Sequence, residues 1–203
     1  MNRQPEGQDN ARYHLRRPRL PRKRDVGVSA PPLLAVEGLT VGYGRSPVVR
    51  DVLLAVGVSG IGALVGADGA GKTTTSCVIV SAVRPQAGTV LLGGRSLKNL
   101  LSGGKQQMLA PARALGRRPS ILIDKISAGL APMLVEHLLA LLRRLADEAQ
   151  LAVLLVEQHV DLALACAGRG YVLRHVELVA EGLASDLARD HHLLEASFLG
   201  EVL

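Results

Sequence analysis

The segment "IGALVGADGAGKTT", residues 61–74, contains the pattern G-x-x-x-x-G-K-S/T in "GADGAGKT", residues 66–73. This pattern is typical of a loop that holds nucleotide phosphates between a strand and a helix, and the apolar run before it fits that strand. A chance glycine-rich turn is the weaker interpretation. Glycines let backbone N–H groups curl around a phosphate, toward which the next helix directs its positive end. Lys72 is expected to reach the β- and γ-phosphates, and the Thr73 hydroxyl to bind magnesium.

Short apolar runs on either side of this loop predict an α/β domain with a mostly parallel sheet. Residues 33–44 and 48–56 are rich in Val and Leu and predict a β-rich start that feeds a buried central strand. The runs "SILID" at 120–124 and "LAVLLVE" at 151–157 each follow a helical stretch, as parallel strands do in βαβ units.

The segment "APMLVEHLLALLRRLADEAQ", residues 131–150, predicts an amphipathic helix between those two strands. Pro132 fits its first turn, where the missing N–H costs nothing. Leucines at spacings of three and four predict the face turned to the core, which consists of Leu134, Leu138, Leu141, Leu142 and Leu145.

The net charge of +6 belongs to the start of the chain, because residues 1–24 hold eight basic and two acidic side chains. Residues 1–32 are therefore expected to form a flexible arm rich in Arg and Pro, and residues 33–203 one domain. The arm could contact anionic lipid or RNA, but a solvated extension is the better interpretation. No specific nucleic-acid partner is expected, since an aromatic content of 2% leaves few stacking platforms, among them Tyr171.

No apolar run reaches the roughly 18 residues that a membrane span needs. The two cysteines, Cys77 and Cys166, are too few for a disulfide scaffold, so reduced and partly buried thiols are expected. Both observations favour a soluble chain in a cytosolic setting.

Two further segments suggest a second phosphate-binding element and a metal ligand. "LSGGKQQ", residues 101–107, places a potential N-cap, Ser102, and two glycines before a helical stretch, which is another possible anion-binding helix start. "ILIDKISAGLAP", residues 121–132, leads an apolar strand into Asp124.

In this order, the phosphate loop, "LSGGKQQMLAPARAL", "ILIDKISAGLAP" and "LLVEQHVDLAL" resemble the ATP-binding subunits of ABC transporters. "GLAPMLVEHLLALLRRL", "LLVEQHVDLALACAGRGYVL" and "LLEASFLG" are similar to the subunits that drive import of branched-chain amino acids. The resemblance runs from about residue 33 to residue 200 and implies a P-loop NTPase fold of the ABC ATPase type, with a mostly parallel sheet and an N-terminal antiparallel β portion.

The resemblance also implies a set of roles for the site, with ATP and Mg²⁺ as ligands. Tyr43 would stack on the adenine, Thr73 and Asp124 would hold Mg²⁺, and Gln158 would sense the γ-phosphate. Ser102, Gly103 and Gly104 would contact ATP on a second, homologous subunit, which implies a homo- or heterodimer. The phosphates would be held by Gly66, Ala67, Asp68, Gly69, Ala70, Gly71, Lys72, Thr73 and Thr74. Membrane permease subunits would be further partners, with the chain peripheral at the inner, cytoplasmic face of the cell membrane.

Lys125 departs from the family pattern, which has a catalytic Glu directly after the strand's Asp. An ammonium cannot accept a proton, and loss of a general base typically costs about 100-fold to 10,000-fold in rate. The side chain could instead turn to solvent or pair with Asp124, but the base is missing in either case. A cation here would also compete with magnesium for Asp124.

Two other departures concern the connection to "LSGGKQQ". Only residues 75–100 separate the two motifs, so most of the family's helical lobe, with its glutamine loop, is expected to be missing. Gln86 does not replace that glutamine. Pro111 is expected to kink or shorten the helix after Ser102.

These features leave three hypotheses. The first is an ABC-type ATPase subunit of an amino-acid importer whose turnover and coupling are impaired. The second is a non-hydrolysing, nucleotide-dependent interaction protein, and the third is a decayed family member that folds poorly. The transported substrate cannot be read from this chain, since selectivity would reside in other subunits.

Overall fold

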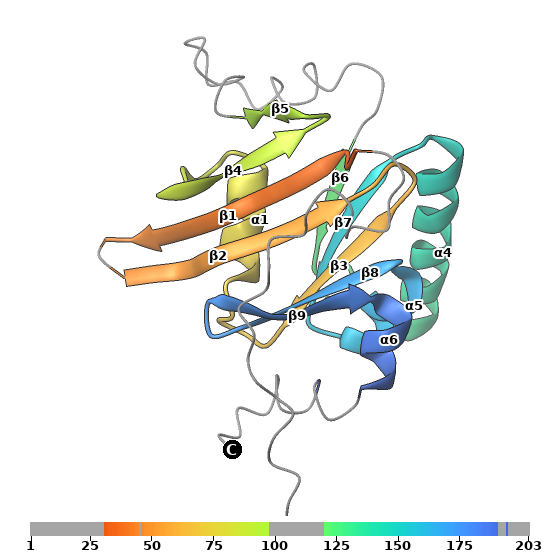
Figure 1. The fold of residues 1–203 in the computed structure, drawn as a ribbon. Coiled ribbons are helices and arrows are strands. Elements are labelled where there is room, and N and C mark those ends of the chain that lie inside the picture. The colour runs from red at the N-terminus through yellow and green to blue at the C-terminus, as the bar shows by residue number, and fades with distance from the viewer. Residues whose placement is uncertain (1–30, 45, 98–119, 191–193, 195–203) are drawn as a thin grey trace, which may run out of the picture.

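The computed structural model describes residues 31–44, 46–97, 120–190 and 194. Their strands form two sheets, with one helix between the sheets and other helices on the outer face of the larger sheet (Figure 1). The segment with Ser102, Gly103, Gly104 and Pro111 lies outside the described residues, as does most of the arm predicted for residues 1–32. The predictions for these segments and for the shortened helical lobe therefore stay predictions.

The first sheet is antiparallel and has the order β2-β1-β4-β5. Its strands are β1 (Leu34–Tyr43), β2 (Ser46–Val56), β4 (Ala87–Leu92) and β5 (Arg95–Ser96). The β-rich start predicted from the apolar runs is confirmed, as is the antiparallel portion implied by the resemblance.

The second sheet has the order β6-β7-β3-β8-β9 and supports the phosphate loop. Its strands are β3 (Ile61–Gly66), β6 (Ser120–Asp124), β7 (Ala152–Glu157), β8 (Arg169–Arg174) and β9 (Glu177–Leu183). All neighbouring pairs are parallel except β8 and β9. The strands β3 and β7 are buried at every position, because both faces of the sheet are covered.

Four helices complete the described part of the domain, namely α1 (Lys72–Ile79), α4 (Pro132–Glu148), α5 (Val160–Cys166) and α6 (Ala184–Arg189). One apolar cluster joins α1 to both sheets, and a second joins α4, α5 and α6 to the opposite face of the larger sheet. The mostly parallel α/β architecture predicted from the sequence is therefore confirmed.

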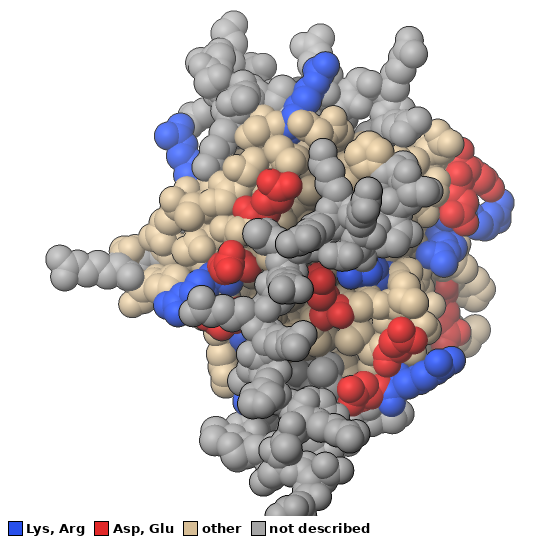
Figure 2. Space-filling model, in the orientation of Figure 1, with Lys and Arg blue, Asp and Glu red and all other residues tan. Residues whose placement is uncertain are grey.

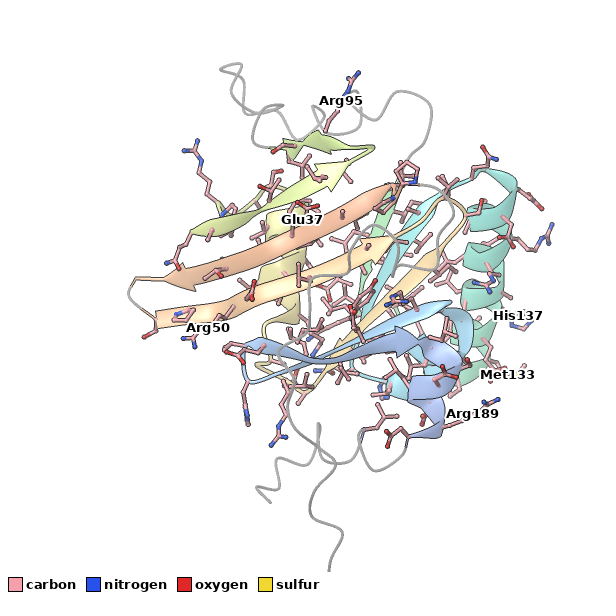
Figure 3. The ribbon with its side chains drawn as sticks, in the orientation of Figure 1. Glu37, Arg50, Arg95, Met133, His137 and Arg189 are labelled. Atoms are coloured by element: carbon pink, nitrogen blue, oxygen red, sulfur yellow. The ribbon has the colours of Figure 1, made fainter. Side chains whose placement is uncertain are left out.

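Helix α4 presents a different face to the core from the one predicted. Leu142 is buried as predicted, but Leu134, Leu141 and Leu145 are exposed and Leu138 is half-buried. The other residues of the buried face are Val135, Leu139 and Ala146. The apolar arc of this helix is wider than the strip that contacts the sheet, and spacing alone does not show which part of the arc packs. Figure 3 shows Met133 and His137 pointing outward from α4, and Met133 is 70% exposed.

Tyr171 ties the two sheets together. Its side chain is 1% exposed; the hydroxyl donates to the Ala55 carbonyl at 2.7 Å and accepts from the Ala55 N–H at 2.9 Å. Burial raises the pKa of this hydroxyl. The suggestion that Tyr171 could stack on a nucleobase is wrong, because the ring lies in the core.

Acidic and basic side chains are interspersed over the described surface visible in Figure 2. Cys77 and Cys166 are both free and half-buried, as predicted. Among the described residues, no helix is long and apolar enough to cross a membrane.

Candidate functional site

The phosphate loop joins β3 to α1, as its sequence predicts, and places Lys72 at the first position of the helix. The Lys72 side chain is folded back onto its own loop. Its Nζ donates to the Gly66 carbonyl at 2.7 Å and to the Ala67 carbonyl at 2.8 Å. A bound phosphate would have to replace these two carbonyls as the partner of the ammonium.

Two glycines of the loop cannot be replaced without movement of the backbone. Gly71 has a φ of 104°, and a Cβ there would lie 2.7 Å from the Val48 carbonyl oxygen. A Cβ at Gly66 would lie 2.3 Å from the Leu173 carbonyl oxygen. The loop therefore packs directly against β2 and β8, and this packing explains two of the glycines that define the motif.

The start of α1 has the features of an anion site. The helix has no side-chain cap on its first turn, so its leading backbone N–H groups remain available to an anion. Thr73 is exposed and Thr74 is half-buried beside them. A surface hollow opens here, lined by Val48, Asp68, Gly69, Gly71, Lys72, Thr73, Thr74 and Lys125.

Lys125 is exposed and lies at the edge of this hollow, as one of its lining residues. The residue follows β6 with a φ of 57°, which is uncommon for a side chain other than glycine. Its backbone N–H donates to the Val156 carbonyl at 2.9 Å. No ion pair joins Lys125 to Asp124 in the part of the chain that the structure describes. Of the two alternatives considered for Lys125, exposure to solvent fits this arrangement, because the side chain is exposed, whereas pairing with Asp124 does not.

The charges around the hollow act on Lys72. Burial lowers the pKa of the Lys72 ammonium, the neighbouring Lys125 cation lowers it further, and the carboxylates of Asp68, Asp124 and Glu157 oppose the shift. Two cations and three carboxylates therefore meet at the carboxyl edge of the parallel strands.

Glu157 is a residue of this site that the sequence reasoning missed. It ends β7 and is 1% exposed. One carboxylate oxygen accepts from the Ser127 N–H at 2.8 Å, and the other accepts from the Ser127 hydroxyl at 2.8 Å and the Gln158 N–H at 3.2 Å. A Glu that closes an apolar run beside Gln158 was the available signal. Glu157 joins the loop after Lys125 to the end of β7.

Gln158 lies next to the phosphate loop, as its predicted role requires. Its side-chain amide donates to the Asp68 carboxylate. Asp68 is exposed and adds a negative charge to a loop that must hold phosphate, a feature that the sequence reasoning did not weigh. Gln86 donates instead to the backbone carbonyl of Gly44 at 3.2 Å, and it does not line the hollow.

The remaining predicted contacts cannot be placed. The backbone of Tyr43 ends β1, and its side chain lies outside the described residues. Ser102, Gly103 and Gly104 are outside them as well, so the predicted contact with a second subunit stays a prediction.

The protein donors implied for Mg²⁺ are the Thr73 hydroxyl and the Asp124 carboxylate, both exposed. Two such donors suffice where phosphates and water supply the rest. The Lys125 ammonium, however, lines the same hollow as Thr73, and like charges repel. Within the described ranges, no group of three His, Cys, Asp or Glu could hold a metal ion. These residues therefore make a poor magnesium site.

Comparison with known proteins gives relatives of one kind. No family model matches the chain. The high-affinity branched-chain amino acid transport ATP-binding protein BraG of Pseudomonas aeruginosa is 38% identical over 101 residues, 49% of this chain and 42% of the relative. The methionine import ATP-binding protein MetN 1 of Rhodococcus jostii is 25% identical over an alignment of 233 positions, which covers 79% of this chain and 69% of the relative. Because 79% of a 203-residue chain is far fewer than 233 residues, many positions of that relative face gaps here.

Solved structures share the fold. An ATP-binding cassette of an ABC transporter in its ADP conformation has a TM-score of 0.66 at 16% identity, covering 85% of this chain and all of that one. The protein cbiO1 of Clostridium perfringens, part of the ABC transporter complex cbiONQ, has a TM-score of 0.64 at 14% identity, and the match covers 82% of this chain and 95% of that one. The fold is therefore that of ABC ATPase domains. The relatives support an ATP-binding subunit of an ABC transporter, but the substrates in their names vary, and the BraG match spans less than half of that protein.

Proposed function

We propose that this chain is a nucleotide-binding subunit of an ABC importer that binds ATP at residues 66–74 and hydrolyses it slowly or not at all. The hollow in which Lys72, the start of α1 and Lys125 meet carries the proposal. This hollow combines the phosphate-binding loop with a cation, Lys125, at the position where ATP hydrolysis needs a general base.

Binding uses groups already in position. Lys72 exchanges the carbonyls of Gly66 and Ala67 for oxygens of the β- and γ-phosphates. The uncapped N–H groups of α1 point their dipoles at the same anion. Gly71 keeps the loop close to β2, so the phosphates approach backbone and not side chains.

Hydrolysis lacks a proton acceptor among these residues. The Lys125 ammonium has three N–H donors and no acceptor, and the neutral amide of Gln158 is not a base. Glu157 does not substitute for the missing Glu, because both of its oxygens already accept hydrogen bonds inside the protein. The loss of a positioned base accounts for about 100-fold to 10,000-fold in rate.

The finer assignment is an importer of amino acids, with branched-chain amino acids as the cargo. It rests on the similarity to BraG, whose name describes branched-chain amino acid transport, and to MetN 1, whose name describes methionine import. A homologous subunit would supply the second face of the nucleotide site through its "LSGGKQQ" segment, and membrane permeases would receive the pair. The chain would then lie at the cytoplasmic face of the membrane.

The second candidate is a non-hydrolysing protein whose ATP binding controls pairing with an intact homologous subunit. Lys125 favours this second candidate, because an ammonium at the hollow is able to bind phosphate but is unable to act as the general base of hydrolysis. Co-purification with such a subunit only in the presence of ATP supports this candidate. Failure to pair under every nucleotide condition argues against it.

ATP binding, measured by equilibrium dialysis with labelled ATP, tests the main proposal. Lys72→Ala should abolish binding, and Arg95→Ala should not, because Arg95 points away from the domain (Figure 3) and lies outside the hollow. Absence of binding by the unaltered chain refutes the proposal. A phosphate-release assay should show faster turnover in Lys125→Glu than in the unaltered chain. Hydrolysis by the unaltered chain at the rates of intact ABC ATPases would show that the interpretation of Lys125 is wrong.

A further inference from the structure

Lys125 and Lys72 both line one hollow at the start of α1. In a magnesium-dependent site, the divalent ion offsets the negative charge of the β- and γ-phosphates. Here a second fixed cation is available for the same purpose. A cation supplied by the protein can offset the charge of the phosphates without a bound metal ion.

The backbone holds Lys125 at this place. Asp124, the residue before Lys125, ends β6 and its parallel pairing with β7, and the Lys125 N–H donates to the Val156 carbonyl of β7. Two residues later, Ser127 is held by Glu157 through both its N–H and its hydroxyl. The backbone of Lys125 is therefore fixed on both sides by β7, and this places the base of its exposed side chain at the edge of the hollow.

Magnesium meets two obstacles at the same point. The donors left to it, Thr73 and Asp124, are exposed and close to a positive charge. One oxygen of the Asp68 carboxylate already accepts a hydrogen bond from the Gln158 amide. A triphosphate that arrives with its metal brings less negative charge to two ammonium groups than a metal-free one does.

We propose that this chain binds the metal-free triphosphate, with Lys125 in the place of Mg²⁺. The inference rests on the proposed function, because it requires that ATP binds at the phosphate loop. It differs from that function in naming the ionic form of the ligand. The site prefers ATP without a divalent ion, or does not distinguish the two forms.

The experiment measures ATP affinity of the full chain by isothermal titration calorimetry, once with EDTA and once with excess Mg²⁺. The unaltered chain should bind in EDTA at least as tightly as in Mg²⁺. Lys125→Met removes the charge and keeps most of the side chain, and should weaken binding in EDTA about 10-fold to 100-fold, the usual value of one charge-assisted hydrogen bond. Lys125→Glu should bind only with Mg²⁺.

Two controls separate loss of charge from loss of fold. Lys125→Asn removes the same charge with a residue that tolerates a positive φ, so it should match Lys125→Met. Arg95→Met removes a cation outside the hollow and should change neither affinity. Thermal unfolding of each variant checks that the domain is intact.

The outcomes distinguish this inference from the function on which it rests. Binding in Mg²⁺ that disappears in EDTA overturns the inference and leaves ATP binding standing. Equal affinities for the unaltered chain and Lys125→Met in EDTA also overturn it. Absence of binding in both buffers refutes the proposed function itself.

Discussion

Replacing Glu157 with Gln tests whether this buried carboxylate organises the site. Glu157 accepts from the Ser127 N–H with one oxygen and from the Ser127 hydroxyl and the Gln158 N–H with the other. A glutamine has one oxygen and one NH₂ group in these two places. Whichever way the amide is turned, its NH₂ group faces a backbone N–H, so one buried donor loses its partner.

The expected loss of stability follows from those contacts. A buried N–H without an acceptor costs about 1–3 kcal/mol, and the remaining bonds lose their charge assistance. We expect Glu157→Gln to lower the free energy of unfolding by about 2–3 kcal/mol, or roughly 4–12 °C in the unfolding midpoint for a domain of this size. Ser127→Ala removes only the hydroxyl donor and should cost about 1 kcal/mol.

Urea unfolding followed by far-UV circular dichroism measures both changes, and Glu177→Gln is the matched control. Glu177 pairs with Arg50 at 3.5 Å, but both side chains are more than half exposed, so its loss should stay within about 0.5 kcal/mol. ATP affinity should also fall in Glu157→Gln, since either the Ser127 N–H or the Gln158 N–H loses its acceptor at the edge of the site. A Glu157→Gln protein as stable as the Glu177→Gln control would refute the reasoning.

Three other predictions test the packing described above. Leu142→Ala should lower the free energy of unfolding by about 3 kcal/mol and Leu141→Ala by less than about 0.5 kcal/mol, because Leu142 is 7% and Leu141 48% exposed; urea titration checks both. Gly71→Ala should abolish ATP binding by dialysis, since a Cβ would meet a backbone carbonyl oxygen, whereas Gly69→Ala, with nothing within 4 Å, should retain more of it. The raised pKa of Tyr171 keeps it protonated in the folded state above pH 10, where an unfolded tyrosine ionises, so stability should fall as the pH rises past 10. Stability curves of Tyr171→Phe should lack that contribution; an unchanged pH dependence would contradict it.

The sequence was most informative where local pattern and chemistry coincide. The strand, the phosphate loop and the start of α1 are set by residues 61–74, because an apolar run, two close-packed glycines and Lys72 each constrain the same short segment. The face of α4 was predicted incorrectly since Leu134 and Leu145 have the helical spacing of a core stripe, while the neighbouring stripe of Val135 and Ala146 makes the contact. Periodicity gives the width of an apolar arc but not the direction from which a sheet approaches it.

Glu157 could not be placed by the same reasoning. Its role depends on Ser127, thirty residues earlier, and parallel pairing of β6 with β7 brings the two together only in the folded chain. Lys125 shows the converse. The absence of a general base was predicted from the place of Lys125 in the motif. Its position at the edge of the hollow depends on a positive backbone φ, which only the structure shows.

The hydrogen bonds between Tyr171 and Ala55 also give the protein an intrinsic spectroscopic probe of the contact between its two sheets. The chain has no tryptophan and three tyrosines, so its near-ultraviolet optical activity comes chiefly from a few phenol rings. Tyr171 is held in an asymmetric, water-free setting by two hydrogen bonds from a single residue of the other sheet. Loss of the near-ultraviolet circular dichroism of tyrosine while the far-ultraviolet signal of the helices persists would therefore indicate that the two sheets separate before their secondary structure unfolds.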